Sequence, residues 1–245
     1  MDVSFNSEND FYKSVNIKLG EGSEGVCYKH NNIVLKKFHD FYIVDKSIKK
    51  LLQFKNVESE EYYFNKGRLI INNKFSGLTM NYARGKLIEK CIIYQNFDDL
   101  ISAAISYQKS TENISNKGIN CYDMLFVNVL FDNISNKFKI VDTSDFYISD
   151  EDSKRIYQKN IQFLSQDIVN CMFNNILLKY INKSKKLNQI IEIENSYITL
   201  SGKIATLKEI ISPVDVLKII KLELQELCNQ EINSVYDCIK KIRKV

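Results

Sequence analysis

The stretch Leu19-Gly-Glu-Gly-Ser-Glu-Gly-Val-Cys27 decides how the first part of the chain is interpreted. Three of the eight glycines in this 245-residue chain, Gly20, Gly22 and Gly25, lie within six residues here. Glycine suits places where backbone N–H groups must approach phosphate oxygens, because it has no Cβ in the way. The strand-like run Ile33-Val-Leu-Lys-Lys-Phe38 follows, whereas a dinucleotide-binding fold would have a helix after the glycines. The pattern predicts strands joined by a glycine-rich turn that covers a nucleotide, although the glycines alone also fit a loose hairpin.

A lysine in the next predicted strand is the candidate phosphate ligand. Alternation along a strand places Val34 and Lys36 on one face and Leu35 and Lys37 on the other. An ammonium beside a glycine-rich turn is well placed to bind α- and β-phosphates. The alternative is that both lysines only solvate an edge strand.

A second group of polar residues lies in the middle of the chain. In Tyr122-Asp-Met-Leu-Phe-Val-Asn128 an aspartate and an asparagine stand five positions apart, directly before a predicted strand. The Asp123 carboxylate can accept a hydrogen bond from an attacking hydroxyl, and the Asn128 oxygen is a hard ligand suited to Mg²⁺. Asp142, at the end of another strand-like run, is a second candidate ligand for Mg²⁺. Each of these residues taken alone also fits ordinary turn chemistry.

The pattern of apolar residues changes near residue 82. The part before it predicts a small antiparallel sheet with one helix over Asp45–Lys55, and strands over Val15–Leu19, Gly25–Lys29, Asn32–Phe38, Gly67–Asn72 and Phe75–Tyr82. The pairs Asn31-Asn32 and Asn72-Asn73 are predicted turns. The remainder predicts a hairpin over Asn128–Asp132 and Phe138–Asp142, and helices over Phe97–Ser110, Asn160–Lys179, Ser184–Ile193 and Leu207–Ile211 and from about Val214 to the end. The long final helix is expected to pack in the core, with contact to a partner as the alternative. We therefore expect one bilobal α+β unit, with a sheet lobe over 1–82 and a helical lobe over 83–245.

Composition narrows the class of protein. Lys+Arg 34 against Asp+Glu 30 gives a net charge of only +4, and the dispersed charge argues against a nucleic-acid binder. The chain has two histidines, so mechanisms that need a histidine cluster are not expected. Its six cysteines contain no C-x-x-C pair and predict buried or half-buried thiols in a reducing compartment. With no run of 18 apolar residues and a polar start, the expectation is a cytoplasmic protein that does not cross a membrane.

Taken together, the motifs resemble the catalytic domain of protein kinases. The glycine-rich turn, the strand lysine, Asp-x-x-x-x-Asn and the strand-terminal aspartate occur in that family's order and approximate spacing. Over about residues 15 to 148, the chain resembles a short, divergent eukaryotic-type Ser/Thr protein kinase of the bacterial or phage kind. The resemblance implies a bilobal kinase-like fold that binds ATP and Mg²⁺ and transfers the γ-phosphate to a Ser or Thr hydroxyl of a protein.

The resemblance also implies a role for individual residues. Gly20, Gly22 and Gly25 would cover the phosphates, Lys36 would pair with them, Asp123 would be the catalytic aspartate, and Asn128 and Asp142 would hold Mg²⁺. The implied adenine pocket has Leu19, Val26 and Val34 on one side, Leu130 on the other, Met80 as the gatekeeper, and the backbone of Asn81 and Ala83 as the hinge.

The sequence also departs from the kinase pattern. Cys121-Tyr-Asp123 stands in place of His-Arg-Asp, Leu125 in place of a lysine, and Asp142-Thr-Ser144 in place of Asp-Phe-Gly. The helix predicted over Asp45–Lys55 contains no glutamate for Lys36. Glu58, Glu60 and Glu61 lie just beyond it, and of these Glu58 is the favoured partner. Two alternatives stay open. One is a nucleotide-binding pseudokinase that acts as a scaffold, and the other is a small-molecule kinase related to aminoglycoside and choline kinases.

Overall fold

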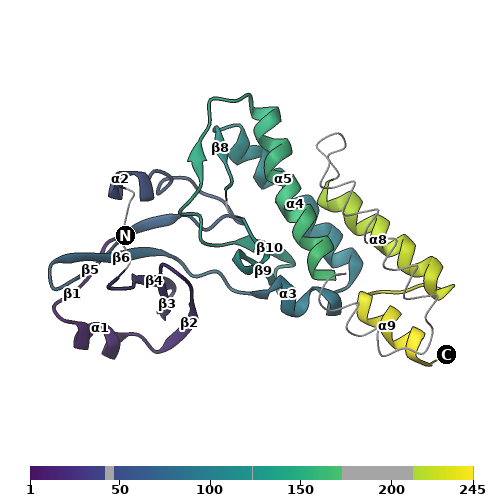
Figure 1. Ribbon diagram of the computed structural model, residues 1–245, viewed down its shortest axis with the longest axis horizontal. Helices are drawn as coiled ribbons and strands as arrows, with labels where there is room; N and C mark the ends of the chain where they lie inside the picture. Colours follow the sequence, from purple (N-terminus) through teal and green to yellow (C-terminus); the bar gives the residue numbers. More distant parts are fainter. Residues whose placement is uncertain (42–46, 123, 173–211, 245) are drawn as a thin grey trace. The chain divides into compact units, whose positions relative to one another are not determined.

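The computed structural model describes residues 1–41, 47–122, 124–172 and 212–244 (Figure 1). They form two compact units. The first comprises Met1–Ala83 together with Val141–Ser144, and the second comprises Arg84–Ile140 and the described residues from Asp145 onward. The chain is α+β, with a mixed six-stranded sheet and several helices, which is compatible with the expected bilobal arrangement. The segment Val141–Ser144 was expected in the second part, but it belongs to the first.

The first unit is built on the six-stranded sheet, whose strand order is β1-β5-β6-β4-β3-β2 (Figure 1). The strands are β1 Val3–Phe5, β2 Ile17–Glu21, β3 Gly25–His30, β4 Ile33–Phe38, β5 Asn65–Ile71 and β6 Lys74–Asn81. The five predicted strands are confirmed with small shifts at their ends. Asn31, Asn72 and Asn73 have positive φ angles of 54°, 53° and 60°, as the predicted turns require.

The sequence did not predict strand β1, which pairs in parallel with β5. Two further contacts fix it to the sheet. The Thr79 hydroxyl donates to the Met1 carbonyl at 2.7 Å, and Arg68 forms an ion pair with the Asp2 carboxylate. The signal was too short to detect, because three residues do not establish an alternation.

The two faces of the sheet pack against different partners. Helix α1, Glu8–Ser14, places the fully buried Phe11 against Leu35, Leu69 and Ile71 on one face. On the other face Phe38 packs with Leu51 and Leu78. The predicted alternation of Leu35 and Lys36 between the faces is therefore confirmed.

The helix expected over Asp45–Lys55 is wrong in extent. Among the described residues of this range, 47–55, only α2, Ile48–Leu51, is helical, and turns follow it. The Asn65 side-chain amide donates to the Leu51 carbonyl at 3.2 Å. An α-helix continuing to Lys55 would bring the Lys55 N–H to that carbonyl, but this N–H bonds Leu52 instead, at 3.1 Å.

The second unit combines short strands with helices (Figure 1). Its strands are β7 Lys86–Leu87, β8 Ile119–Asn120, β9 Val129–Asp132, β10 Lys137–Ile140 and β11 Tyr147–Ile148. Its described helices are α3 Ile88–Cys91, η1 Ile92–Tyr94, α4 Phe97–Ser115, η2 Phe126–Asn128, α5 Ser153–Val169, α8 Pro213–Cys228 and α9 Val235–Lys244. The predicted β9–β10 hairpin is confirmed, with Asn136 at φ 48° in its turn.

Several helix boundaries differ from those predicted. Helix α4 extends to Ser115, and α5 begins at Ser153, where the Asp152 side chain accepts from the Arg155 N–H. The prediction of one long final helix is wrong. Asn229, with φ 50°, ends α8, and a second helix, α9, begins at Val235. The helices predicted over 184–193 and 207–211, and the end of the one predicted to residue 179, lie outside the described residues.

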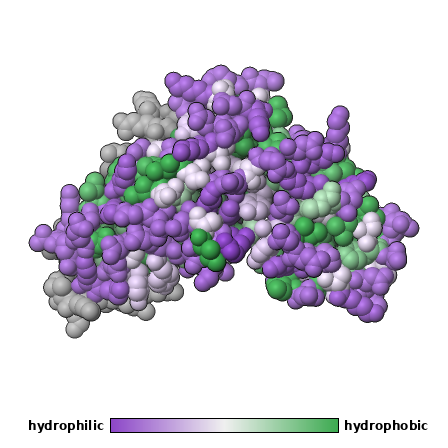
Figure 2. Space-filling model, turned by 180° about the vertical axis from the view of Figure 1, so that it is seen from behind, coloured by the Kyte–Doolittle hydropathy of each residue, from purple (hydrophilic) through white to green (hydrophobic). Residues whose placement is uncertain are grey.

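Three features of the described residues bear on the predictions from composition: the length of apolar helices, the polarity of the surface and the burial of the cysteines. Within the described ranges, no helix is both long and apolar enough to span a membrane. Hydrophilic residues cover most of the face drawn in Figure 2. All six cysteines are free and buried or half-buried, as predicted. The Sγ atoms of Cys228 and Cys238 lie 2.9 Å apart, a pairing that their spacing in the sequence did not indicate.

Candidate functional site

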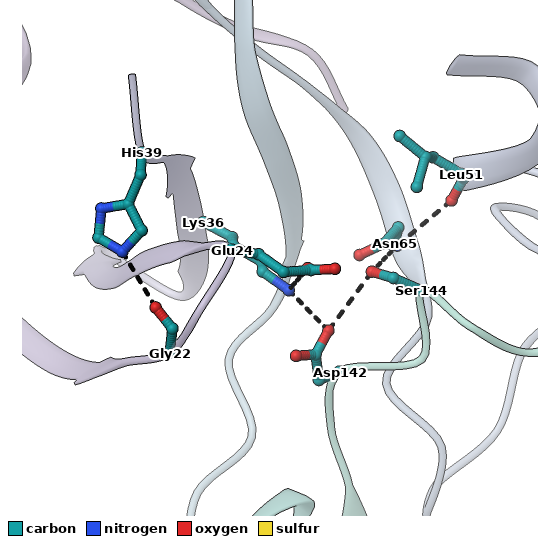
Figure 3. Close-up of polar contacts among 8 residues, drawn as sticks. All are labelled: Gly22, Glu24, Lys36, His39, Leu51, Asn65, Asp142 and Ser144. Carbon is teal, nitrogen blue, oxygen red and sulfur yellow. Dashed lines mark hydrogen bonds and ion pairs between the residues drawn. The ribbon is translucent and has the colours of Figure 1, made fainter. Parts of the chain in front are cut away.

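The candidate site of the first unit centres on the Lys36 side chain, which projects from β4 (Figure 3). Its Nζ atom lies 2.8 Å from Asp142 Oδ1 and 2.5 Å from Glu24 Oε2. Asp142 is 106 residues away in the chain and Glu24 is 12 residues away. Folding thus joins two of the predicted site residues, Lys36 and Asp142, in one ion pair.

The acidic partner of Lys36 differs from the predicted one. Glu58 bonds Lys66 instead, at 2.9 Å. Glu24 takes this place from the turn between β2 and β3, within the glycine-rich stretch itself. Its position between Gly22 and Gly25 was visible in the sequence. The resemblance to kinases implied a carboxylate in or near the predicted helix, and not in the turn.

The ion pairs leave Lys36 charged although it is buried. Burial lowers the pKa of Lys36, but the nearby charge and hydrogen bond of Asp142 and those of Glu24 outweigh this effect, so the pKa lies above its ordinary value. The Lys36 side chain is 5% exposed, whereas those of Glu24 and Asp142 are 23% and 39% exposed. The ammonium is therefore a fixed positive charge, and its two partners remain accessible from solvent.

A polar network holds Asp142 next to the lysine (Figure 3). The Ser144 hydroxyl lies 3.4 Å from Asp142 Oδ1, and the buried Asn65 amide donates to the Ser144 hydroxyl at 3.2 Å and to the Leu51 carbonyl at 3.2 Å. Asp142 itself adopts φ 54°, a left-handed conformation that disfavours residues with a Cβ. Strained backbone of this kind is concentrated at functional sites. Ser144, which stands where the kinase pattern has glycine, thus links Asp142 to Asn65.

The three glycines of the turn have different reasons to be glycine. A Cβ at Gly25 would lie 2.2 Å from the Lys37 carbonyl oxygen, so the packing of β3 on β4 requires glycine there. A Cβ at Gly20 or Gly22 would meet nothing within 4 Å, and neither residue has a positive φ. The fold gives no reason for glycine at these two positions. Open space here is what the predicted approach of a phosphate to the backbone requires.

Strand register corrects one of the predicted adenine contacts. Residues directly opposite on neighbouring strands project to the same face. Cys27 is opposite Lys36, whereas Val26 is opposite Lys37, on the face covered by α1. Val26 therefore does not share a face with Val34, whereas Cys27 does. Burial raises the pKa of the Cys27 thiol to about 11, so the thiol is neutral at physiological pH.

The other predicted adenine contacts of the first unit lie along β2 and β6. Met80 is buried and opposite Val34, on the Lys36 face. Leu19 is 41% exposed and lies at the register irregularity of β2, between Lys18 and Gly20. Asn81 ends β6, and the buried Ala83 is the last residue of this part of the first unit.

The remaining predicted residues belong to the second unit. Asn128 ends the short helix η2, with its N–H donating to the Leu125 carbonyl at 2.8 Å, and Leu130 lies in β9 opposite Lys139. Asp123 lies outside the described residues.

The segment directly before Asp123 is held by a residue that the sequence reasoning missed. Asn160 of α5 is fully buried and accepts from the Cys121 N–H at 2.8 Å. Its amide donates to the Ile119 carbonyl at 2.9 Å and to the Ser115 hydroxyl at 3.0 Å. The only sequence signal was an asparagine on the apolar stripe of a helix.

A second buried polar residue of α5 contacts the segment after Asp123. The Asp167 carboxylate accepts from the backbone N–H of Phe126, and its Oδ2 atom has no hydrogen-bond partner. Burial raises the pKa of Asp167 to about 8, despite the opposing effect of that hydrogen bond. Helix α5 thus contacts the predicted catalytic loop on both sides of its aspartate.

The donors present fit the implied ligands. Asp142 offers carboxylate oxygen, the ligand type that Mg²⁺ prefers, and Mg²⁺ commonly takes one or two carboxylates plus phosphate oxygens. The space over Gly20 and Gly22 and the Lys36 ammonium suit a phosphate chain. In the part of the chain that the structure describes, no three His, Cys, Asp or Glu side chains are grouped to hold a metal by themselves.

Comparisons with known proteins add no family to this description. No protein-family model matches the chain, and no curated protein matches it either. The resemblance to protein kinases therefore remains a prediction from the motifs.

Proposed function

We propose that this chain is an ATP-dependent phosphotransferase, and that it acts as a Ser/Thr protein kinase. The observation that carries the proposal is the contact of Lys36 with Asp142, 2.8 Å apart and 106 residues distant in the chain. These two residues were predicted to bind phosphate and Mg²⁺ from separate motifs. Their ion pair lies on the face of β4 opposite to α1. Of the open glycines, Gly20 lies in β2 of the same sheet and Gly22 in the turn that follows it.

In the proposed mechanism, each residue has one task. Lys36 and the backbone of the glycine-rich turn bind the triphosphate. Asp142 and Asn128 would hold Mg²⁺, which would offset the charge of the phosphates. Asp123 orients the substrate hydroxyl and accepts its proton. The hydroxyl oxygen forms a bond to the γ-phosphorus as the bond to the β,γ-bridging oxygen breaks, and ADP leaves with that electron pair.

Two alternatives keep the same fold and are tested with it. The residues Tyr122 and Leu125, where kinases have arginine and lysine, favour a pseudokinase that binds nucleotide without turnover. The short stretch between Asp142 and α5, which begins at Ser153, favours a small-molecule kinase, because protein substrates dock on a longer segment.

The test is transfer of labelled γ-phosphate by the purified chain with Mg²⁺, using casein, aminoglycosides and choline as acceptors. The proposal predicts label on protein, and its loss in Asp123→Asn. ATP binding without transfer to any acceptor supports the pseudokinase. Transfer only to the small molecules supports the second alternative, and absence of ATP binding refutes all three.

A further inference from the structure

Glu24 lies inside the glycine-rich segment and bonds the residue proposed to bind phosphate. Its Oε2 atom is 2.5 Å from Lys36 Nζ, and Asp142 Oδ1 is 2.8 Å from the same nitrogen (Figure 3). An ammonium has three N–H donors, so two of the three bond carboxylates. One of these carboxylates comes from the segment that would cover the phosphates of a nucleotide.

The backbone of this turn is fixed, while the Glu24 carboxylate remains partly exposed. The Gly22 N–H donates to the Gly25 carbonyl, and the His39 N–H donates to the Glu24 carbonyl, both at 3.0 Å. The His39 Nε2 atom also lies 3.0 Å from the Gly22 carbonyl oxygen. Rotation of the Glu24 side chain into solvent would break its ion pair with Lys36 and leave these backbone contacts intact.

The charges of the group oppose the binding of an anion beside Glu24. One ammonium and two carboxylates sum to a net charge of −1. Phosphate oxygens bind an ammonium in much the same way as carboxylate oxygens do. A phosphate oxygen bonded to Nζ would lie next to the Glu24 carboxylate, and like charges that close repel each other. Phosphate and Glu24 therefore compete for the same ammonium.

We propose that Glu24 occupies the phosphate-binding position of Lys36 in the nucleotide-free protein and must leave it when a nucleotide binds. The inference rests on the proposed role of Lys36. It makes Glu24 a determinant of nucleotide affinity within the turn. A Mg²⁺ ion on Asp142 offsets one of the two carboxylates, so the competition is strongest without the metal.

The experiment is titration calorimetry of the full chain with ATP, in EDTA and with Mg²⁺. Glu24→Gln is expected to lower the Kd for ATP in EDTA about tenfold, which corresponds to ~1.4 kcal/mol, and to change it less with Mg²⁺. The matched control is Glu58→Gln, since Glu58 lies outside the glycine-rich segment and pairs with Lys66 instead of Lys36. Both variants remove one negative charge. An unchanged Kd in the control would therefore assign the gain to the contact with Lys36 and not to net charge.

The outcomes separate this inference from the function on which it rests. The inference is overturned if both variants gain the same affinity for ATP. It is also overturned if Glu24→Gln keeps its melting temperature and gains no affinity for ATP. Weaker binding together with slower turnover in Glu24→Gln overturns it too, because Glu24 would then position Lys36. If Glu24→Gln does not fold, Glu24→Asp replaces it, with a smaller gain expected because the shorter side chain loosens the pair. If neither the wild type nor any variant binds ATP, the proposed function itself fails.

Discussion

The substitution Asn160→Ala tests how α5 supports the predicted catalytic loop. Asn160 is fully buried in the second unit and makes three side-chain hydrogen bonds, to Cys121 at 2.8 Å, Ile119 at 2.9 Å and Ser115 at 3.0 Å. Alanine removes all three hydrogen bonds, and the buried groups that made them lose the asparagine as a partner. The Tyr107 hydroxyl bonds the backbone carbonyl of residue 160, at 3.0 Å, and keeps its partner.

The magnitude follows from these contacts. A buried polar group left unpaired costs about 1 kcal/mol or more, so three of them predict a loss of ~3 kcal/mol in the free energy of unfolding. At 2–4 °C for each kcal/mol in a chain of this size, the melting temperature should fall by roughly 6–12 °C. Because the Cys121 N–H lies two residues before Asp123, we also expect lower kcat. The KM for ATP should change little, since Asn160 does not contact Lys36.

The assay combines urea unfolding followed by circular dichroism with steady-state phosphate transfer. The control is Lys154→Ala, an exposed position on the same helix, for which no change is expected. A loss of less than 1 kcal/mol in Asn160→Ala would refute the energetic argument. A raised KM for ATP with unchanged kcat would refute the assigned role in the catalytic loop.

Two further predictions test single features of each unit. Gly25→Ala should lower the melting temperature by several degrees, because the added Cβ would lie 2.2 Å from the Lys37 carbonyl oxygen. Gly22→Ala should leave the melting temperature unchanged, because the space around Gly22 is open. Equal effects of the two substitutions in differential scanning fluorimetry would contradict this reasoning. Burial raises the pKa of Asp167 to about 8 in the folded protein. Between about pH 4 and 8, the Asp167 carboxyl group is therefore protonated in the folded protein and ionised in the unfolded chain. The wild type should therefore lose stability as pH rises, by up to ~1.4 kcal/mol for each pH unit, and Asp167→Asn should reduce this slope. Urea unfolding at pH 5.5 and 7.5 measures both, and an identical pH dependence of the two proteins would refute the assignment.

The sequence predicted most of the first sheet, because its signals are local. Alternating residues mark five strands, and asparagines with positive φ mark the turns at 31 and 72–73. The signals that failed depend on distant partners. In strand β1, Val3 pairs with Leu69, which is 66 residues away in the chain. Helix α2 ends at Leu51, whose carbonyl accepts a hydrogen bond from the Asn65 side chain. The spacing of residues along the chain indicates neither of these two contacts.

The candidate site was predictable in its residues and less so in its pairings. Lys36 and Asp142 were both selected from local motifs, and the structure joins them. Glu58 was the wrong partner because the kinase pattern places the carboxylate near the helix, whereas the turn of this chain supplies Glu24. Val26 was expected on the same face as Val34, but the strand register places Cys27, and not Val26, opposite Lys36. Pairing and register are properties of the folded sheet, so a sequence motif indicates them only indirectly.

The central claim is that the Lys36 face of β4 binds the phosphates of ATP, and two adjacent lysines test it most directly. Lys36 contacts Asp142 and Glu24, whereas Lys37 projects to the other face, near Glu8 of α1. Calorimetric titration with Mg²⁺ and ATP should show that Lys36→Ala raises the Kd at least about tenfold, as expected for losing a hydrogen bond to a charged group. Lys37→Ala should leave the Kd unchanged. Equal Kd values for the wild type and both variants, with each protein folded, would contradict the assignment of this face to nucleotide binding.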